Sequence, residues 1–466
     1  MEVAPPRDRV TGRLTLDPTY RRVARDVVLG GTPLRLLRVS PAGSRALDRL
    51  EAGETGGSRS AELLAARLVT RGLAHPQPSP CEDEVAQALL TVVIPVRDRA
   101  DLLEELLGDL VGFRVIIVDD ASDDPLGIGA LAGGFGAQLI RLEQRTGPGG
   151  ARNIGARAAT TELVCFLDAD VRVPRGSFAP LLGHFDDPSV AAVAPRLRGP
   201  TGTSLRERFE LDESPLDMGA TPGQVRPASR LSYVPSAALV VRRSLTDDLF
   251  DARLLVGEDV DAIWRLAAAG WDVRFEPAAI VEHPARPSWR QWVLQRFRYG
   301  TSAAALEERH GAAVAPLRGS PWFLSGWALI VAGRPLAGLG LLLNGAPELA
   351  HALEGLVESP RLLASTIALE HTVTTAPTTA RQLLRSYAPL LGAAAVVSKR
   401  ARRATIGIVI LAGLGRWLRS ERQVDPLRFV MLSTADDLSY CAGLWTGARR
   451  ARSLGALRPH VTRPAA

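Results

Sequence analysis

Lysine and cysteine are both scarce in this sequence of 466 residues. Lys399 is the single lysine among 56 basic residues, a bias typical of a high-GC genome, so the choice of arginine over lysine carries no functional information. The three cysteines, Cys81, Cys165 and Cys441, are far apart and form no Cys-x-x-Cys pair. This spacing argues against a disulfide framework and against a cysteine zinc site. A reducing, cytoplasmic setting fits best.

Long uncharged apolar runs are also lacking. Residues 321–333 and 335–347 are uncharged but are separated by Arg334, and residues 404–415 form a third short run. None of them alone reaches the roughly 18–20 residues that a membrane-spanning helix needs. The first residues contain no apolar stretch, so we expect no secretory signal.

Charge is distributed unevenly along the chain. Residues 1–75 have a net charge of +5, residues 76–360 of −10, and residues 361–466 of +11. The acidic centre argues against a nucleic-acid groove. The basic segment 399–403 precedes the apolar residues 406–411, a combination that suits peripheral contact with the inner face of the cell membrane. A soluble helical domain with buried helices is the open alternative for this region.

Residues 90–285 alternate between strand-like and helix-like segments. Apolar runs that predict strands occupy 91–96, 115–118, 137–142 and 163–167, and 100–110 is amphipathic as a helix requires. Such alternation predicts a mostly parallel sheet covered by helices on both faces. Ligands of these sheets bind at the carboxyl ends of the strands.

Acidic residues stand where these strands end. They are Asp119 and Asp120, Asp168 and Asp170, and, opening a helix after Gly257, Glu258, Asp259 and Asp261. Because side chains alternate along a strand, Asp168 and Asp170 are expected on one face, where they can grip a ribose and a hard cation together. Helix capping or simple solvation is the alternative for an isolated Asp-x-Asp.

A glycine-rich segment, 147–155, is predicted to open a helix, whose N-terminus attracts anions. Arg152 within it is a candidate contact for a phosphate or a base. The alternative is an ordinary glycine-rich turn with a surface arginine. The segment is neither a Walker loop nor a Gly-x-Gly-x-x-Gly motif.

Five motifs in this order resemble the inverting family 2 glycosyltransferases of GT-A fold. The motifs are Val-Val-Ile-Pro-Val-Arg-Asp at 92–98, Val-Asp-Asp-Ala-Ser at 118–122, Gly-Ala-Arg-Asn-Ile-Gly at 150–155, Asp-Ala-Asp at 168–170 and Gly-Glu-Asp-Val-Asp at 257–261. The resemblance implies an α/β fold with a Rossmann-like, mixed, mostly parallel GT-A core over 90–310. It also implies a nucleotide-sugar donor and a divalent cation, Mg²⁺ or Mn²⁺.

The same resemblance implies residue roles. The nucleotide-sugar would be held by Pro95, Arg97, Asp98, Asp120, Arg152 and Asp168, with Asp120 accepting a hydrogen bond from the uracil ring. The metal ligands would be Asp170 and His283, although a histidine merely satisfied at a strand end is the alternative for His283. Asp259 would be the catalytic base, with Glu258 as its alternative or as its orienting partner.

A segment at 295–299, Gln-Arg-Phe-Arg-Tyr, resembles the Gln-x-x-Arg-Trp element of polymerising members of the family. It implies that Gln295, Arg298 and Tyr299 contact the acceptor, although tyrosine replaces the usual tryptophan. An amphipathic helix that packs Trp289, Trp292 and Phe297 into the core is the alternative.

The flanks complete the predicted organisation. Residues 1–80 resemble PqqD-like winged-helix domains through the strand-like segment 26–38 and the helix start at Ser40 and Pro41. Such domains can pair a peptide with a sheet edge. A structural cap is the alternative, and basic residues do not cluster as DNA binding would require. Residues 311–466 are expected to form a helical, partly apolar and basic C-terminal region.

The three parts together resemble the glycosyltransferases of mycofactocin systems. This resemblance implies that the enzyme glucosylates the peptide-derived redox cofactor mycofactocin or its precursor, building β-1,4-linked units from UDP-glucose. Two alternatives remain at this point: a family 2 enzyme acting on a lipid or cell-wall glycan, and a non-catalytic peptide-binding module.

Overall fold

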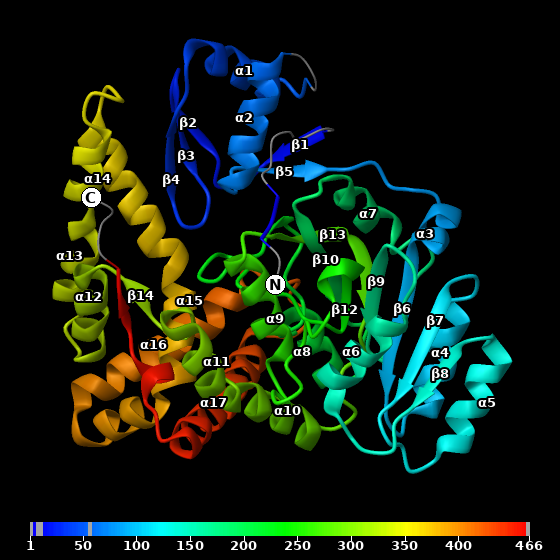
Figure 1. Cartoon of the computed structure of the whole chain (residues 1–466). Helices are drawn as coiled ribbons and strands as arrows, with labels where there is room; N and C mark the ends of the chain where they lie inside the picture. The colour runs from blue at the N-terminus through cyan, green and yellow to red at the C-terminus, as the bar shows by residue number, and fades with distance from the viewer. Residues whose placement is uncertain (1–2, 6–12, 55–57, 463–466) are drawn as a thin grey trace. The chain divides into compact units, whose positions relative to one another are not determined.

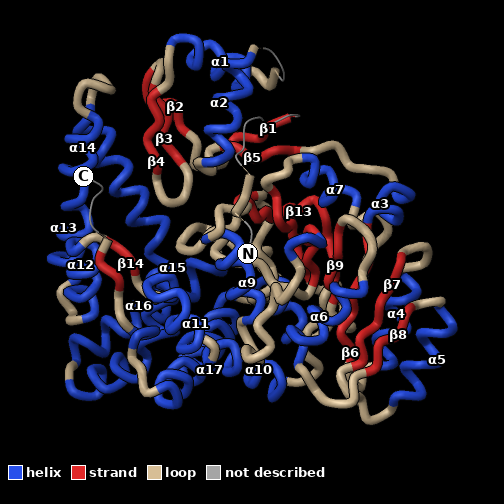
Figure 2. The backbone as a smooth tube through the Cα atoms, viewed as in Figure 1, coloured by secondary structure: helices blue, strands red, loops and turns tan. Residues whose placement is uncertain are grey.

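The computed structural model describes residues 3–5, 13–54 and 58–462, and it divides into two compact units (Figure 1). The first unit comprises residues 1–200 and 215–284, and the second comprises residues 201–214 and 285–466. The first contains every strand of the large sheet, whereas the second is mostly helical (Figure 2).

The first unit begins with a small α+β part. Its elements are β1 (Arg13–Leu16), β2 (Arg21–Ala24), β3 (Val27–Gly30), β4 (Arg35–Arg38), α1 (Pro41–Glu51), α2 (Arg59–Thr70) and β5 (Ala74–Gln77). Strands β2, β3 and β4 form an antiparallel sheet, and β1 pairs with β5. The predicted helix start at Pro41 is confirmed, because the Ser40 side chain caps the Gly43 N–H. Val28, Leu37, Leu47 and Leu68 lie in the core of this part.

An eight-stranded mixed sheet forms the centre of the first unit. Its strand order is β11-β13-β10-β12-β9-β6-β7-β8. The strands are β6 (Leu90–Val96), β7 (Arg114–Asp119), β8 (Gln138–Arg141), β9 (Leu163–Leu167), β10 (Val190–Arg198), β11 (Gly223–Gln224), β12 (Ala238–Arg242) and β13 (Asp272–Glu282). The four strands from β9 to β8 run parallel, as the buried apolar runs predicted. Strand β12 is antiparallel to both neighbours, which makes the sheet mixed.

Helices follow the strands in the order that the sequence indicated. They are α3 (Asp83–Leu89), α4 (Ala100–Asp109), α5 (Pro125–Phe135), α6 (Gly147–Ala158), α7 (Ala179–Leu182) and α9 (Glu258–Ala268). Helix α6 packs closely on the sheet, because a Cβ atom on Gly155 would lie 2.4 Å from Val93 and 2.9 Å from Val118. This close approach fixes the N-terminus of α6 over the carboxyl ends of β6 and β7.

The second unit is built from helices. They are α8 (Leu205–Glu213), α10 (Trp289–Thr301), α11 (Ala303–His310), α12 (Pro321–Val331), α13 (Pro335–Leu342), α14 (Ala346–Leu353), α15 (Pro360–Val397), α16 (Lys399–Trp417) and α17 (Pro426–Ala451). Two short strands, β14 (Arg318–Gly319) and β15 (His460–Val461), pair in parallel. Short 3-10 helices occupy Gly183–Asp186 and Arg243–Leu245 in the first unit, and Gly311–Val314, Leu343–Gly345 and Gly455–Leu457 in the second.

Helices α8, α10 and α11 therefore pack with the C-terminal helices. Helix α15 bends at Tyr387, two residues before Pro389, as a proline inside a helix causes. Within the described part of the chain, no helix combines the length and the apolar character that crossing a bilayer would take.

Candidate functional site

Asp120, which directly follows β7, fixes the loop that leads from β8 to helix α6. Its two carboxylate oxygens accept hydrogen bonds from the backbone N–H groups of Thr146, at 2.6 Å, and Gly147, at 2.9 Å. Gly147 is the first residue of α6 and has a φ of +78°, which glycine adopts without strain. The carboxylate thus lies at the N-terminus of this helix, and its predicted contact with a uracil ring remains a prediction.

The loop after β6 is joined to the loop after β7. The Asp98 N–H donates to the Ser122 hydroxyl at 3.0 Å, and the Asp98 carboxylate accepts from the Asp123 N–H at 2.7 Å. Asp98 takes the left-handed conformation, with φ of +51°, to do so. Pro95 lies within β6, and the Arg97 guanidinium lies 3.3 Å from the Asp98 carboxylate. Pro95, Arg97 and Asp98 therefore lie at the carboxyl end of the central strand β6. Their contacts with a nucleotide-sugar remain a prediction.

Arg152 is buried, so the alternative of a surface arginine is wrong. Only 3% of its side chain is exposed, and its guanidinium donates to the Asp168 carboxylate at 2.5 Å and to the Glu258 carboxylate at 3.0 Å. The Phe250 ring lies 5.4 Å away as a cation–π partner. Arg152 therefore joins the Asp-x-Asp turn to the Glu-Asp helix start, and its Nε is buried without a partner among the described residues.

Asn153 is a neighbour of Arg152 to which the sequence analysis assigned no role. Its side-chain amide donates to the Phe250 carbonyl at 2.6 Å and accepts from the Phe250 N–H at 3.0 Å. This paired contact holds the segment that carries Phe250 beneath Arg152. Its position within the Gly-Ala-Arg-Asn-Ile-Gly motif could have indicated that Asn153 belongs to the site.

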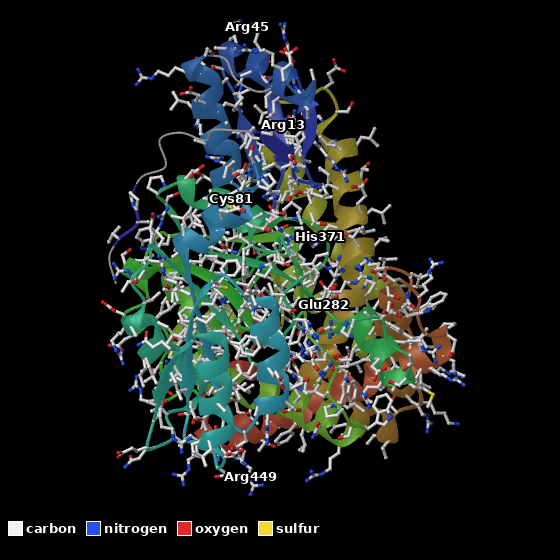
Figure 3. All side chains as sticks on the ribbon, turned by 90° about the vertical axis from the view of Figure 1, so that its right-hand side faces the viewer. Arg13, Arg45, Cys81, Glu282, His371 and Arg449 are labelled. Carbon is white, nitrogen blue, oxygen red and sulfur yellow. The ribbon has the colours of Figure 1, made fainter. Side chains whose placement is uncertain are left out.

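Asp168 and Asp170 lie in a turn. The expectation that they share a face by strand alternation is wrong in its premise, because β9 ends at Leu167. Asp168 pairs with Arg152, whereas an oxygen of Asp170 lies 3.7 Å from Nε2 of His283. His283 directly follows β13, whose last residue, Glu282, is labelled in Figure 3. The turn thus directs its two aspartates to two different partners.

Asp170 and His283 fit a divalent cation. Adjacent ligands of an octahedral Mg²⁺ at ~2.1 Å would stand about 3 Å apart, close to the observed 3.7 Å. Both side chains are largely buried, and the distance between them is longer than a hydrogen bond. No cluster of three or more possible protein ligands exists among the described residues. A cation here would keep most of its coordination positions for diphosphate oxygens and water.

Glu258 and Asp259 form an acidic pair at the first turn of α9. Burial, and after it the neighbouring Asp259, raise the pKa of Glu258 to about 7, although Arg152 opposes both effects. Burial also raises the pKa of Asp259, whose carboxylate accepts from the N–H groups of Val260 at 2.8 Å and Ser236 at 3.3 Å. The pair therefore holds a proton at a pH at which exposed carboxyls are ionised.

These groups connect into one site at the carboxyl ends of the central strands. Asp120 holds the start of α6, Arg152 on α6 binds Asp168 and Glu258, and the Asp168 N–H donates to the Ala237 carbonyl at 3.0 Å, next to Ser236. The arrangement places a proton-accepting acid pair close to a turn that can bind a cation and a polyol.

The Gln-Arg-Phe-Arg-Tyr segment lies on α10 in the second unit. The Gln295 amide donates to the Tyr299 hydroxyl at 3.0 Å, and Arg298 is exposed. Arg296 is almost fully buried and pairs with Glu210 and Asp436. The alternative of core packing holds for Trp292, which is buried, but not for Trp289, which is 42% exposed. Acceptor contacts of Gln295, Arg298 and Tyr299 remain a prediction.

Comparison with known proteins identifies the family. Residues 91–250 match glycosyl transferase family 2. A pre-mycofactocin glycosyltransferase of Mycobacterium tuberculosis is 40% identical over 453 residues, which cover 93% of this chain and 94% of that protein. The chain belongs to glycosyl transferase family 2. The family match of this glycosyltransferase ends before Gly257, so the Glu258–Asp259 pair lies outside it.

A more distant relative of this family 2 glycosyltransferase and a solved structure are also similar to the chain. A probable glycosyltransferase of Bacillus subtilis, YdaM, is 24% identical over 229 residues, 45% of this chain and 54% of that protein. Among solved structures, a mannosyltransferase of Pyrobaculum calidifontis in complex with GDP-Man and Mn²⁺ matches with a TM-score of 0.43 and 19% identity, covering 78% of this chain and 90% of that chain. The family assignment and the mixed, mostly parallel sheet agree with the predicted GT-A fold.

Proposed function

We propose that this glycosyltransferase transfers glucose from UDP-glucose, with inversion at the anomeric carbon, to the peptide-derived redox cofactor mycofactocin or its precursor, adding β-1,4-linked units. The observation that carries the proposal is the 40% identity to a pre-mycofactocin glycosyltransferase across 93% of this chain. The connected carboxylates of the first unit support it, because they supply what a transfer from a nucleotide-sugar requires.

The donor would bind at the carboxyl ends of β6, β7 and β9. In this proposal Pro95, Arg97, Asp98 and Asp120 surround the base, and Asp168 accepts from the ribose. Arg152 contributes positive charge beside Asp168. Asp170 and His283 would hold Mg²⁺ or Mn²⁺, which neutralises charge on the departing diphosphate when bound.

The chemical step needs one base. An acceptor hydroxyl attacks the anomeric carbon from the side opposite the diphosphate, the bond to the diphosphate oxygen breaks, and the hydroxyl proton passes to a carboxylate. We assign Asp259 as that carboxylate. Glu258 orients it, and Arg152, which also pairs with Asp168, lowers the pKa of Glu258. Both acids begin a helix, where negative charge is stabilised by the helix dipole.

The acceptor would be recognised by two further regions. Gln295, Arg298 and Tyr299 would contact its sugar, with Tyr299 stacking on a ring face. The N-terminal part would recognise its peptide portion, since β2 and β4 are both edge strands of a three-stranded sheet. We also include association with the inner face of the cell membrane in the proposal.

An acceptor assay tests the proposal. The purified chain is incubated with Mn²⁺ and with UDP-glucose or GDP-mannose as the donor. The acceptor is the peptide-derived precursor or a lipid extract, and products are identified by mass spectrometry. Glucosylated precursor from UDP-glucose, with the β configuration by proton coupling, is the expected product. Transfer only to the lipid extract would favour a lipid or wall-glycan acceptor. Tight precursor binding without any transfer would favour a peptide-binding module.

Asp259→Asn and Asp170→Asn test the assigned roles. Each should lower transfer by about a hundredfold or more, because one removes the base and the other a metal ligand. Asp248→Asn is the matched control, since Asp248 is exposed and pairs only with exposed Arg157. Near-normal transfer by both site variants would refute the roles given to Asp259 and Asp170.

A further inference from the structure

Two connections between helices of the second unit, called turns here, lie side by side. One joins α12 to α13 and contains Gly333, and the other joins α15 to α16 and contains Ser398. A Cβ atom on Gly333 would lie 2.7 Å from the Cβ of Arg400, so the first turn touches the first residues of α16. Gly333 has a φ of +78°, so both its conformation and its space favour glycine.

Both turns expose apolar side chains. Leu336, Val396 and Val397 are 85%, 83% and 89% exposed, among the highest values for large apolar residues in the described chain. Along α16, Ile406 and Ile410 continue this exposed apolar surface at a spacing of one helical turn. On its opposite side, α16 buries Ile408 and Ala412 in the core of the unit. The helix therefore has apolar residues on two sides, one packed in the core and the other exposed.

The same two turns carry only positive charge. We define the basic tip as the exposed residues Arg334, Leu336, Val396, Val397, Lys399, Arg400, Arg402 and Arg403. None of its five basic side chains forms an ion pair with another described residue. The segment 371–420 contains eight basic and no acidic residues. Of these, Arg381, Arg385 and Arg416 are paired with acids inside the unit, and four of the other five belong to the tip.

We propose that the basic tip docks the helical unit peripherally on an anionic phospholipid surface. Exposed valines and leucine at helix turns suit the boundary between headgroups and acyl chains, and the surrounding arginines suit the phosphates. The long arginine and lysine stems can lie along apolar surface while their charges stay in water. A neutral or acidic protein surface would complement only half of this combination.

Vesicle co-sedimentation of the full chain tests the proposal. Vesicles of phosphatidylglycerol mixed with phosphatidylcholine are compared with vesicles of phosphatidylcholine alone. The protein should bind the mixed vesicles and not the neutral ones. Binding should weaken as salt rises, because the screening length falls from about 10 Å at 0.1 M to about 3 Å at 1 M.

Paired variants locate the contact. Arg402→Glu with Arg403→Glu should weaken binding to the mixed vesicles by about tenfold or more. The matched control is Arg449→Glu with Arg450→Glu, on exposed residues of α17 in the same unit, and it should bind as the unchanged protein does; Arg449 is labelled in Figure 3. Val396→Ser with Val397→Ser should weaken binding severalfold, whereas Leu427→Ser, at a leucine of α17 that is 70% exposed, should not.

Several results would overturn the proposal. Equal binding to neutral vesicles, or equal loss in both arginine pairs, would remove the tip as an anionic-lipid contact. A dimer in solution that the valine variant abolishes, without vesicle binding, would assign the tip to a second copy of the chain. Transfer to a soluble acceptor should be unchanged in all tip variants, so failure of this proposal can be separated from failure of the proposed function.

Discussion

Arg152 is the single side chain on which the candidate site depends most. It contacts Asp168 from the turn after β9 and Glu258 from the start of α9. A buried guanidinium that donates to two carboxyl groups fixes where they point. We therefore regard Arg152 as a positioning residue that links donor binding to the state of the acid pair.

Arg152→Met should lower kcat/KM by about a hundredfold, because both carboxylates lose the group that orients them. It should also move the acidic limb of the pH–rate profile to higher pH, since Arg152 lowers the pKa of Glu258. Arg152→Lys should restore part of the pH profile but less of the rate, because an ammonium cannot reproduce the fork of a guanidinium. A loss of rate with an unmoved pH limb would reduce Arg152 to a structural role.

Glu258 makes stability depend on pH in an unusual direction. Its pKa rises from 4.5 in the unfolded chain to about 7 in the folded one, so the folded state holds the proton more tightly. The contribution of Glu258 to the free energy of unfolding is therefore greatest below pH 4.5 and falls as the pH rises through 7. We expect this fall to be about 2–3 kcal/mol larger in the unchanged protein than in Glu258→Gln. Urea unfolding of both proteins at pH 5 and pH 8 measures the difference, and parallel pH dependences would contradict it.

At the scale of elements, helix α6 determines whether the site forms. It carries Arg152, its first N–H group donates to the Asp120 carboxylate, and Gly155 lets it approach the sheet. Gly155→Ala would place a methyl group 2.4 Å from Val93, in a buried strand that cannot yield freely. The close packing of α6 on the sheet thus requires glycine at position 155.

Gly155→Ala should therefore destabilise the protein by about 1–3 kcal/mol and lower transfer as well. Gly133→Ala is the matched control within helix α5, where nothing lies within 4 Å of the added Cβ. That change should be neutral or stabilising by up to about 1 kcal/mol, because alanine favours the helix. Thermal unfolding and initial rates of both variants test the contrast. Equal effects of the two substitutions would show that α6 tolerates displacement.

Much of this arrangement is predictable from the sequence, because the relevant signals are local. The buried strands β6, β7 and β9, the start of α6 and the helix after Gly257 all follow from short apolar runs, glycines and capping residues. The end of β9 at Leu167 was predicted, but the separate partners of Asp168 and Asp170 were not, because strand alternation does not hold in the turn that follows. The partners of Arg152 were not predictable either, because Glu258 lies 106 residues away in sequence.

At the scale of the whole chain, long-range ion pairs hold the helical unit together. Arg296 on α10 pairs with Glu210 on α8 and with Asp436 on α17, at 2.7 Å for the second pair. Asp437, the next residue, accepts from Arg381 on α15 and Arg416 on α16. Consecutive aspartates on α17 thus gather arginines from three other helices, a network that only the folded chain can assemble.

Two arginines on α10, two residues apart, separate stability from activity. Arg296→Met should cost about 3–5 kcal/mol, because Glu210 would remain buried without its cation and Asp436 would keep Arg381, at 3.4 Å, but lose its closer partner. Arg298→Ala should change stability by less than about 0.5 kcal/mol, since Arg298 is exposed, but should lower transfer if it contacts the acceptor as proposed. Urea unfolding and transfer assays on both variants provide the two readouts. Full transfer by a stable Arg298→Ala protein would remove Arg298 from the acceptor site, and a stable Arg296→Met protein would show that the network tolerates an unpaired acid.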